Sequence, residues 1–128
     1  MNTYKGALFL DVETANSKQN SICQLSFMII NNDHKEVFSF NEYIKPFEHY
    51  YENEFQFTDI HGITWNDVKH KRKFNAIWND IKSFFNSNYL IFAHNASFDI
   101  TCIQKTIDYY NISKPNFNYA CTYLPLKK

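Results

Sequence analysis

Glycine and proline are scarce in this sequence, and their scarcity excludes several classes of protein. The 128 residues contain two glycines and three prolines. No glycine-rich phosphate-binding loop occurs, which argues against a nucleotide-binding regulatory domain. With 45% apolar residues and no repeats, the chain is expected to fold as one ordinary globular domain over residues 1–128.

Cysteine and long apolar runs are also in short supply. The three cysteines, Cys23, Cys102 and Cys121, form no Cys-x-x-Cys pair. Each lies in an apolar stretch, which favours a buried, reduced thiol over a metal ligand or a nucleophile. No apolar run approaches the ~20 residues that cross a membrane, and the N-terminus lacks a signal-peptide pattern. We therefore expect a cytoplasmic protein without a membrane partner.

Neither sign of charge dominates, because 13 Lys and Arg residues balance 13 Asp and Glu residues. The overall basicity that would by itself indicate nucleic-acid binding is absent. One local exception is the basic run KHKRK at residues 69–73. It is interpreted either as solvated surface or as a contact with a phosphate backbone.

Hydrophobic patterning predicts a mixed α/β domain. Strands are expected at residues 5–12, 21–30, 37–45, 89–94 and 117–124. The first of these, a continuous apolar run, is expected to be buried on both faces. Residues 47–63 are predicted to form a long loop. Helices are expected from a cap near Thr64, over residues 74–85, and after a cap at Asn95 or Ser97.

The first strand runs into two carboxylates, Asp11 and Glu13. Residues two apart on a strand share a face and lie about 6.6 Å apart, so both side chains can reach one ion. Carboxylate oxygens are the ligands that Mg²⁺ prefers, together with water and substrate phosphate. The alternative is that the strand has already ended and both acids are merely solvated.

A second acid-bearing segment, HNASFD, follows the strand predicted at residues 89–94 and places Asp99 in a first helical turn. Negative charge is favoured at a helix N-terminus, which offers a structural explanation. Together, however, the two segments bring three acids to the carboxyl ends of two strands. That crevice is where open α/β sheets bind ligands.

The stretches FLDVETAN, HGIT and HNASFD resemble the DEDD superfamily of 3′–5′ exonucleases. The similarity is to the branch that holds the proofreading epsilon subunit of bacterial replicative polymerases and ribonuclease T. It implies a ribonuclease H-like mixed β-sheet with flanking helices, with residues 1–128 forming the N-terminal three-quarters of the domain. The family's C-terminal helical region is expected to be lacking.

The resemblance also implies roles for individual residues. Asp11 should bridge two divalent cations, Mg or Mn, with Glu13 ligating one and Asp99 holding the other through water. Thr14 lies where the family contacts the terminal nucleotide. The implied reaction is two-metal hydrolysis, in which one ion activates water and the other stabilises the leaving 3′-oxygen.

Several further residues are candidates for substrate binding, each with a structural alternative. His61 is interpreted as a substrate contact or as a loop anchor. His94 either orders its turn or approaches the substrate, and Asn95 adjoins it. Phe98 either stacks on an unpaired terminal base or packs in the core.

The family's third motif, a His followed five residues later by an Asp, does not occur after YACTYL. A general base contributes ~10²–10⁴-fold, so weak or absent hydrolysis is expected of this chain. A missing helical region should also expose apolar surface near the last strand and favour self-association.

The sequence therefore predicts a metal-dependent 3′–5′ exonuclease that acts on single-stranded DNA or RNA 3′ ends in replication or repair. The alternative is a non-catalytic module that binds single strands or docks on a DNA polymerase subunit. DNA and RNA are not distinguished by any of these residues.

Overall fold

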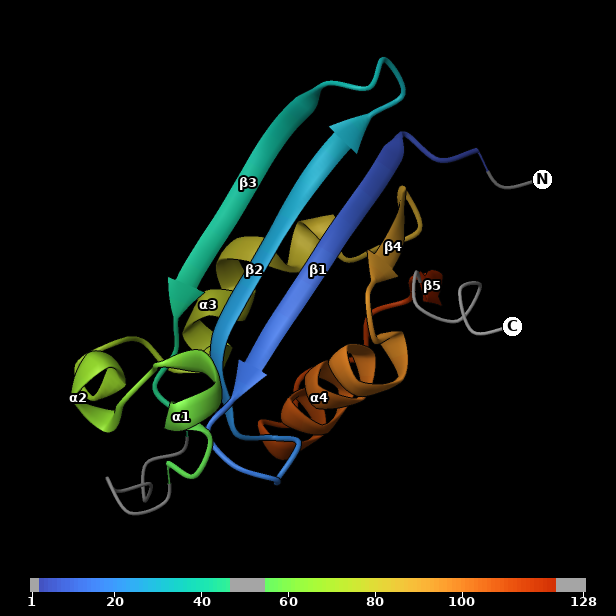
Figure 1. The fold of residues 1–128 in the computed structure, drawn as a ribbon. Helices are drawn as coiled ribbons and strands as arrows, with labels where there is room; N and C mark the ends of the chain where they lie inside the picture. The colour runs from blue at the N-terminus through green and yellow to red at the C-terminus, as the bar shows by residue number, and fades with distance from the viewer. Residues whose placement is uncertain (1–2, 47–54, 122–128) are drawn as a thin grey trace.

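Five strands form one mixed sheet (Figure 1), as predicted. The structure, a computed structural model, describes residues 3–46 and 55–121. The strands are β1 (Gly6–Thr14), β2 (Ile22–Asn31), β3 (Glu36–Tyr43), β4 (Tyr89–Ala93) and β5 (Tyr119–Cys121). Their order is β3-β2-β1-β4-β5, with β1 antiparallel to β2 and parallel to β4. β1 therefore lies at the centre, where parallel and antiparallel pairing meet.

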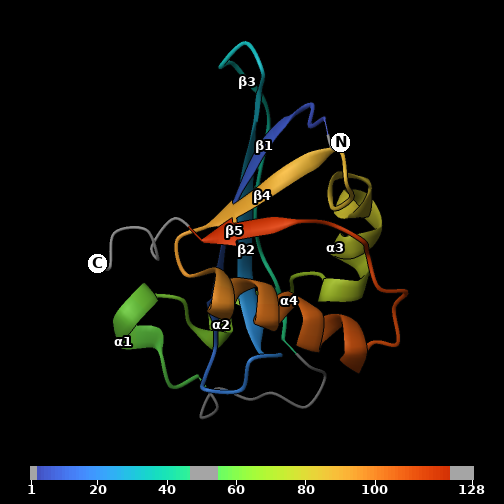
Figure 2. The ribbon, with the colours of Figure 1, turned by 90° about the vertical axis from the view of Figure 1, so that its right-hand side faces the viewer.

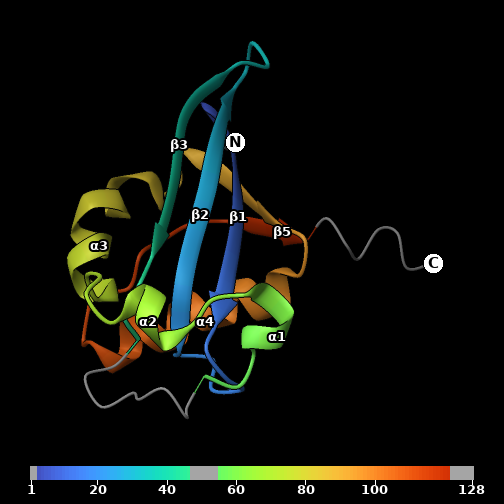
Figure 3. The same ribbon diagram turned by 60° about the vertical axis from the view of Figure 1, so that its left-hand side comes forward.

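Of the two longer helices, α3 (Phe74–Ile81) lies behind the sheet in Figure 1, and α4 (Ala96–Tyr109) lies to the right of the lower end of β1. Buried residues of both helices belong to one core with β1. Figure 2, which shows the sheet from its side, places both of them along the same face. The short helices α1 (Thr58–His61) and α2 (Trp65–Val68) lie at the end of the sheet where β1 terminates, as Figure 3 also shows. We call the face of the sheet opposite α3 and α4 the open face.

β1 buries one face only, which corrects the expectation that both are buried. Leu8, Leu10 and Val12 belong to the core together with residues of α3 and α4, whereas Phe9 is 41% exposed and Asp11 is also exposed. A continuous apolar run predicts two-sided burial only if both faces are covered. Here Phe9 stacks on Phe92 of β4 at 5.4 Å between ring centroids, on the open face.

α3 has the predicted amphipathic stripe, and its buried residues are Phe74, Ile77, Trp78 and Ile81. The helix is shorter than expected, because the chain tightens into a 3-10 turn (η2, Lys82–Phe84) that ends before Phe85. The predicted loop at residues 47–63 contains α1, and its residues 47–54 lie outside the described part. β3 ends at Tyr43, two residues before the predicted end. β5 begins at Tyr119, and residues 122–124 of the strand predicted there also lie outside that part.

The predicted cap at Thr64 is confirmed. The Thr64 hydroxyl accepts a hydrogen bond from the Asp67 N–H, and the Asp67 carboxylate accepts one from the Thr64 N–H. This reciprocal capping box fixes the start of α2. Asn95 occupies the N-cap position of α4, but its side chain makes no capping hydrogen bond.

Cys23 and Cys102 are buried, reduced thiols, as predicted, whereas Cys121 is half-buried and forms no disulfide with the other cysteines of the described residues. Burial raises the pKa of the Cys23 and Cys102 thiols to about 12, so both stay protonated and unreactive near neutral pH. In the ranges 3–46 and 55–121, none of the helices has the length and apolarity needed to span a bilayer.

Candidate active site

Asp11 and Glu13 lie within β1, because the strand continues to Thr14. The alternative in which the strand ends before these acids is therefore wrong. They stand opposite Ser26 and Gln24 of β2, so both side chains project from the open face. The register shifts between Glu13 and Thr14, and such a bulge re-aims the backbone at the end of the strand.

Asp99 reaches the same place from α4 and is buried, with 4% of its surface exposed. Its carboxylate accepts hydrogen bonds from the backbone N–H groups of Val12 and Asn95. The pairing of β4 with β1 ends at Ala93, opposite Leu10, so no β4 residue is paired with Val12. A buried donor without a partner is costly, and Asp99 supplies the partner.

The three carboxylates interact electrostatically. Burial raises the pKa of Asp99 to about 7, and the charges of Asp11 and Glu13 push it in the same direction, against the lowering effect of its two backbone hydrogen bonds. Partial burial also raises the pKa of Asp11 and of Glu13, with the Asp11 charge adding to the effect on Glu13. This sharing of negative charge is typical of carboxylates gathered without a counter-ion.

The chemistry of these donors fits a divalent cation bound from one side. Among the residues described, no three His, Cys, Asp or Glu side chains converge closely enough to form a metal centre by themselves. Mg²⁺ usually takes only one or two protein carboxylates and completes its shell with water and phosphate oxygens. Asp11, Glu13 and Asp99 therefore suit an open site that a substrate phosphate would complete.

His61 anchors the loop between α1 and α2. Its Nδ1 accepts a hydrogen bond from the Ile63 N–H at 3.0 Å, which leaves the proton on Nε2. Nε2 then donates to the Thr14 carbonyl oxygen at 2.9 Å, and the Cys23 sulfur lies 4.0 Å away. Both ring nitrogens are thus used within the protein, which favours the anchor interpretation over a substrate contact.

His94 and Asn95 are exposed at the turn between β4 and α4. The positive charge of His94 works to lower the pKa of Asp11, so the imidazole lies within electrostatic reach of that carboxylate. Phe98 is half-buried and packs against the core, in agreement with its structural interpretation. Thr14 is buried, with 3% of the residue exposed, and offers little surface to a nucleotide.

Sequence reasoning missed one residue that holds this turn. The Cys121 thiol donates a hydrogen bond to the His94 carbonyl oxygen at 3.2 Å and accepts one from the Ala96 N–H at 3.5 Å. β5 therefore fixes the backbone that presents His94 and Asn95. A single cysteine in a short terminal strand carries no sequence signal for this contact.

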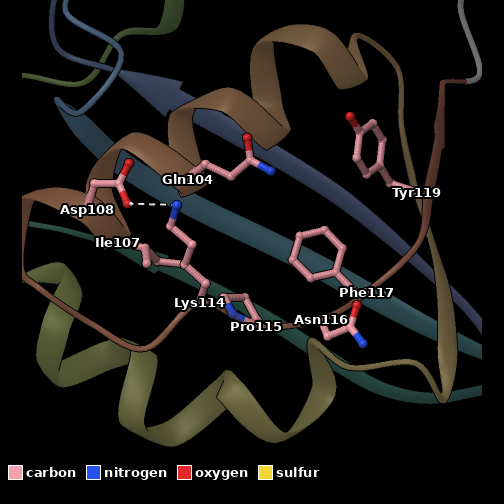
Figure 4. A pocket seen from close by; sticks show the side chains of 8 residues that line it. All are labelled: Gln104, Ile107, Asp108, Lys114, Pro115, Asn116, Phe117 and Tyr119. Atoms are coloured by element: carbon pink, nitrogen blue, oxygen red, sulfur yellow. Dashed lines mark ion pairs between the residues drawn. The ribbon is translucent and has the colours of Figure 1, made fainter.

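The carboxylates do not line the hollow of about 290 Å³ between α4 and the segment that leads to β5. In Figure 4, Lys114 of this segment points at Asp108 of α4, and the two form an exposed ion pair at 3.9 Å. Phe117 and Tyr119 line the other side. This hollow is therefore separate from the candidate active site.

Comparison with solved structures identifies the fold. A product-bound exonuclease I matches with a TM-score of 0.81 and 16% identity, over 98% of this chain and 31% of its own. The rAMP-bound nuclease domain of 3′hExo, a DEDDh family member, matches with a TM-score of 0.71 and 12% identity. This match covers 94% of this chain and 67% of the 3′hExo chain. A zinc-bound E. coli ExoI–ssDNA complex matches with a TM-score of 0.76 and 17% identity. This match covers 93% of this chain and 28% of the ExoI chain. The chain thus spans less than a third of the length of exonuclease I.

No curated protein matches the chain in sequence. The model of an exonuclease family, RNase_T, matches residues 8–128. That range includes the strand with Asp11 and Glu13 and the helix with Asp99, and the ribonuclease H-like sheet agrees with the DEDDh neighbour. The chain therefore belongs to the RNase_T exonuclease family, and the predicted resemblance to the DEDD superfamily is confirmed.

Proposed function

We propose that this chain carries the metal-binding half of a 3′–5′ exonuclease site that hydrolyses single-stranded DNA or RNA from its 3′ end. Membership of an exonuclease family implies the use of divalent metal. The single observation that carries the proposal is the meeting of Asp99 with Asp11 and Glu13 around the backbone of Val12.

In this proposal the three acids hold Mg²⁺ or Mn²⁺. Two such cations would lower the pKa of an attacking water and stabilise the leaving 3′-oxygen. The charge of Asp11 acts on both of the other acids, and two backbone hydrogen bonds hold the Asp99 carboxylate. His94 and Asn95 border the site at the turn before α4, where the terminal nucleotide would bind.

Among the described residues, we assign neither histidine near the three acids as the general base. The imidazole of His61 is engaged at both nitrogens, and His94 belongs to the turn before α4. Because a general base is worth ~10²–10⁴-fold, we expect turnover by this chain to be slow or absent even with metal bound.

Asp11→Ala tests the proposal. A 3′-labelled oligonucleotide is incubated with the wild-type chain and with the variant in Mn²⁺, and Mn²⁺ binding is measured by calorimetry. We expect wild-type Mn²⁺ binding that Asp11→Ala abolishes, together with loss of any trimming. Asp33→Ala, in the exposed turn between β2 and β3, is the matched control. Wild-type binding that survives Asp11→Ala would contradict the assignment.

The second candidate function is a non-catalytic module that binds single strands or docks on a polymerase subunit. Its support is that no histidine in the ranges 3–46 and 55–121 is assigned as a general base. A module of this kind would bind an oligonucleotide as well or better after Asp11→Ala, because one negative charge is removed from the path of the phosphates. The same pair of proteins therefore separates the two functions.

Partners and location belong to the same proposal. The chain would work in the cytoplasm in DNA replication or repair, with a polymerase subunit as its partner. Self-association is proposed for the apolar surface near the last strand, where Tyr119 of β5 is 51% exposed. It would appear in light scattering and would be weakened by Tyr119→Glu.

A further inference from the structure

The open face changes character along its length. Around Phe9, Met28 and Phe92 it is apolar, because these residues are paired across β1, β2 and β4. Toward the end of β1 it becomes polar, in two rows that cross the sheet from the candidate active site to the edge strand β3. The rows are Asp11–Ser26–Asn41 and Glu13–Gln24–Tyr43.

The far ends of these rows open into a hollow of about 380 Å³. It is lined by Gln24, Asn41, Glu42, Tyr43 and Lys71. Neighbouring strands lie about 4.8 Å apart, so the hollow on β3 is about 10 Å from the carboxylates on β1. Gln24 lines the hollow and also stands directly opposite Glu13, which makes the polar surface continuous between the two.

The amide groups on this surface are held in a defined orientation. Gln24 Nε2 donates to Asn41 Oδ1 at 2.9 Å across the two strands. This bond uses one donor and one acceptor and leaves the second Gln24 donor and both Asn41 N–H donors for a ligand. Such donors suit phosphate and sugar oxygens, which take most protein–nucleic acid hydrogen bonds.

Lys71 provides a positive charge at the edge of the hollow, and the neighbouring Arg72 has a different role. Arg72 pairs with Asp80 at 2.7 Å and with Glu42 at 3.3 Å, so its charge is compensated within the protein. Lys71 lies in the bend that follows α2, where its N–H donates to the Val68 carbonyl oxygen, and its side chain lines the hollow instead. Among the described residues no carboxylate forms an ion pair with Lys71.

We propose that nucleotides preceding the 3′-terminal one cross the open face along these polar rows, with a backbone phosphate paired to Lys71. This inference rests on the proposed function, since the rows start at Asp11 and Glu13. The ligand is a single strand with its phosphodiester backbone, read by charge and amide donors and not by base identity. Of the basic run at residues 69–73, the structure thus assigns Lys71 to the strand and Arg72 to an internal ion pair.

Lys71→Ala tests the proposal when the binding of two ligands is compared. One is thymidine monophosphate (TMP), which can occupy only the terminal-nucleotide position. The other is a single-stranded oligo-dT with a hydrolysis-resistant phosphorothioate at its 3′ linkage. Both are titrated in Mn²⁺ at several salt concentrations. Lys82→Ala, an exposed lysine of η2 in the α3 layer, is the matched control. Asn41→Ala removes the amide on the same surface, and Asp11→Ala reports on the carboxylate site.

We expect Lys71→Ala to weaken oligo-dT binding about two- to fivefold, the worth of one exposed ion pair, and to leave TMP binding unchanged. The slope of log affinity against log salt should fall by about 0.7, the value for one phosphate on a single strand. Asn41→Ala should also weaken only the oligonucleotide, and Lys82→Ala should change neither ligand.

Two results would contradict the proposed path of the strand and leave the assignment of the carboxylate site unaffected. One is equal oligonucleotide binding by wild type, Lys71→Ala and Lys82→Ala, while Asp11→Ala still abolishes TMP binding. The other is an equal loss of both ligands in Lys71→Ala, which would indicate a structural role. If the wild-type chain binds neither ligand in Mn²⁺, the proposed function falls and the path falls with it.

Discussion

The carboxylate of Asp99 accepts a hydrogen bond from the backbone N–H of Val12, the residue that separates Asp11 from Glu13. The bond joins the first turn of α4 to the centre of the sheet. It draws a third carboxylate toward two others that β1 already presents on one face. Because neighbouring negative charges raise the pKa of each carboxyl group, three ionised carboxylates here are electrostatically unfavourable at neutral pH unless a cation or a proton is bound.

Metal affinity should therefore depend on pH. A cation must displace the proton of Asp99, whose pKa burial and the two neighbouring acids raise to about 7. We expect apparent Mn²⁺ affinity to rise with pH up to about 7 and to level off above it. Calorimetric titration across this range measures the effect. Asp99→Asn should remove this rise, and an unchanged profile in that variant would assign the titration to another group.

The folding stability of the metal-free chain should fall as pH rises, whereas the metal affinity rises. The folded-state pKa of Asp99 lies above its unfolded value, so the stabilising proton is fully present below about pH 4 and is lost as pH rises through about 7. Asp99→Asn mimics the protonated form. We expect the variant to be more stable than wild type at pH 8 by about 1–3 kcal/mol, within the range for replacing buried charge. Urea unfolding in EDTA at both pH extremes tests this, and a less stable variant at pH 8 counts against the argument.

Removing the His61 ring should loosen the loop beside the site. His61→Ala leaves the Ile63 N–H and the Thr14 carbonyl oxygen without their present partners, at a cost of about 1–3 kcal/mol. Hydrogen exchange at Ile63 should speed up. The neighbouring Ile60 is 77% exposed, so Ile60→Ala serves as a control that should change little. Unaltered protection at Ile63 in His61→Ala would remove the anchor assignment.

The two glycines should resist substitution for different reasons. A Cβ at Gly6 would lie 2.2 Å from the Ile30 carbonyl oxygen of β2, so Gly6→Ala must push two strands apart. We expect about 1–3 kcal/mol of destabilisation, as for overpacking. Gly62 has open space but a φ of 78°, so Gly62→Ala should cost about 1–2 kcal/mol through backbone strain alone.

Thermal or urea unfolding of the two glycine variants measures the loss of folding free energy caused by each substitution. Ser39→Ala on the exposed edge strand β3 is the reference, expected within about 0.5 kcal/mol of wild type. A Gly6→Ala protein as stable as the reference would mean that β1 and β2 are farther apart at Gly6 than described.

Local patterns determined much of this protein in advance. The apolar spacing of α3, the helix cap at Thr64, and the shared face of Asp11 and Glu13 all follow from residues a few positions apart. Helical and strand periodicity act over such distances, which is why these elements could be predicted. The ends of α3 and β3 were less accurate, since tertiary contacts there compete with weak local preferences.

Only the tertiary structure decided which distant residues meet. It put α3 and α4 on one face of the sheet, so that Phe9 stayed exposed where the apolar run had suggested burial. It also brought Cys121 against the turn of His94 and set Lys71 beside Asn41. These contacts depend on the order of the strands and on which face of the sheet each helix covers. The sequence could not predict them, because residues alternate along a single strand in the same way whatever the strand order and helix placement.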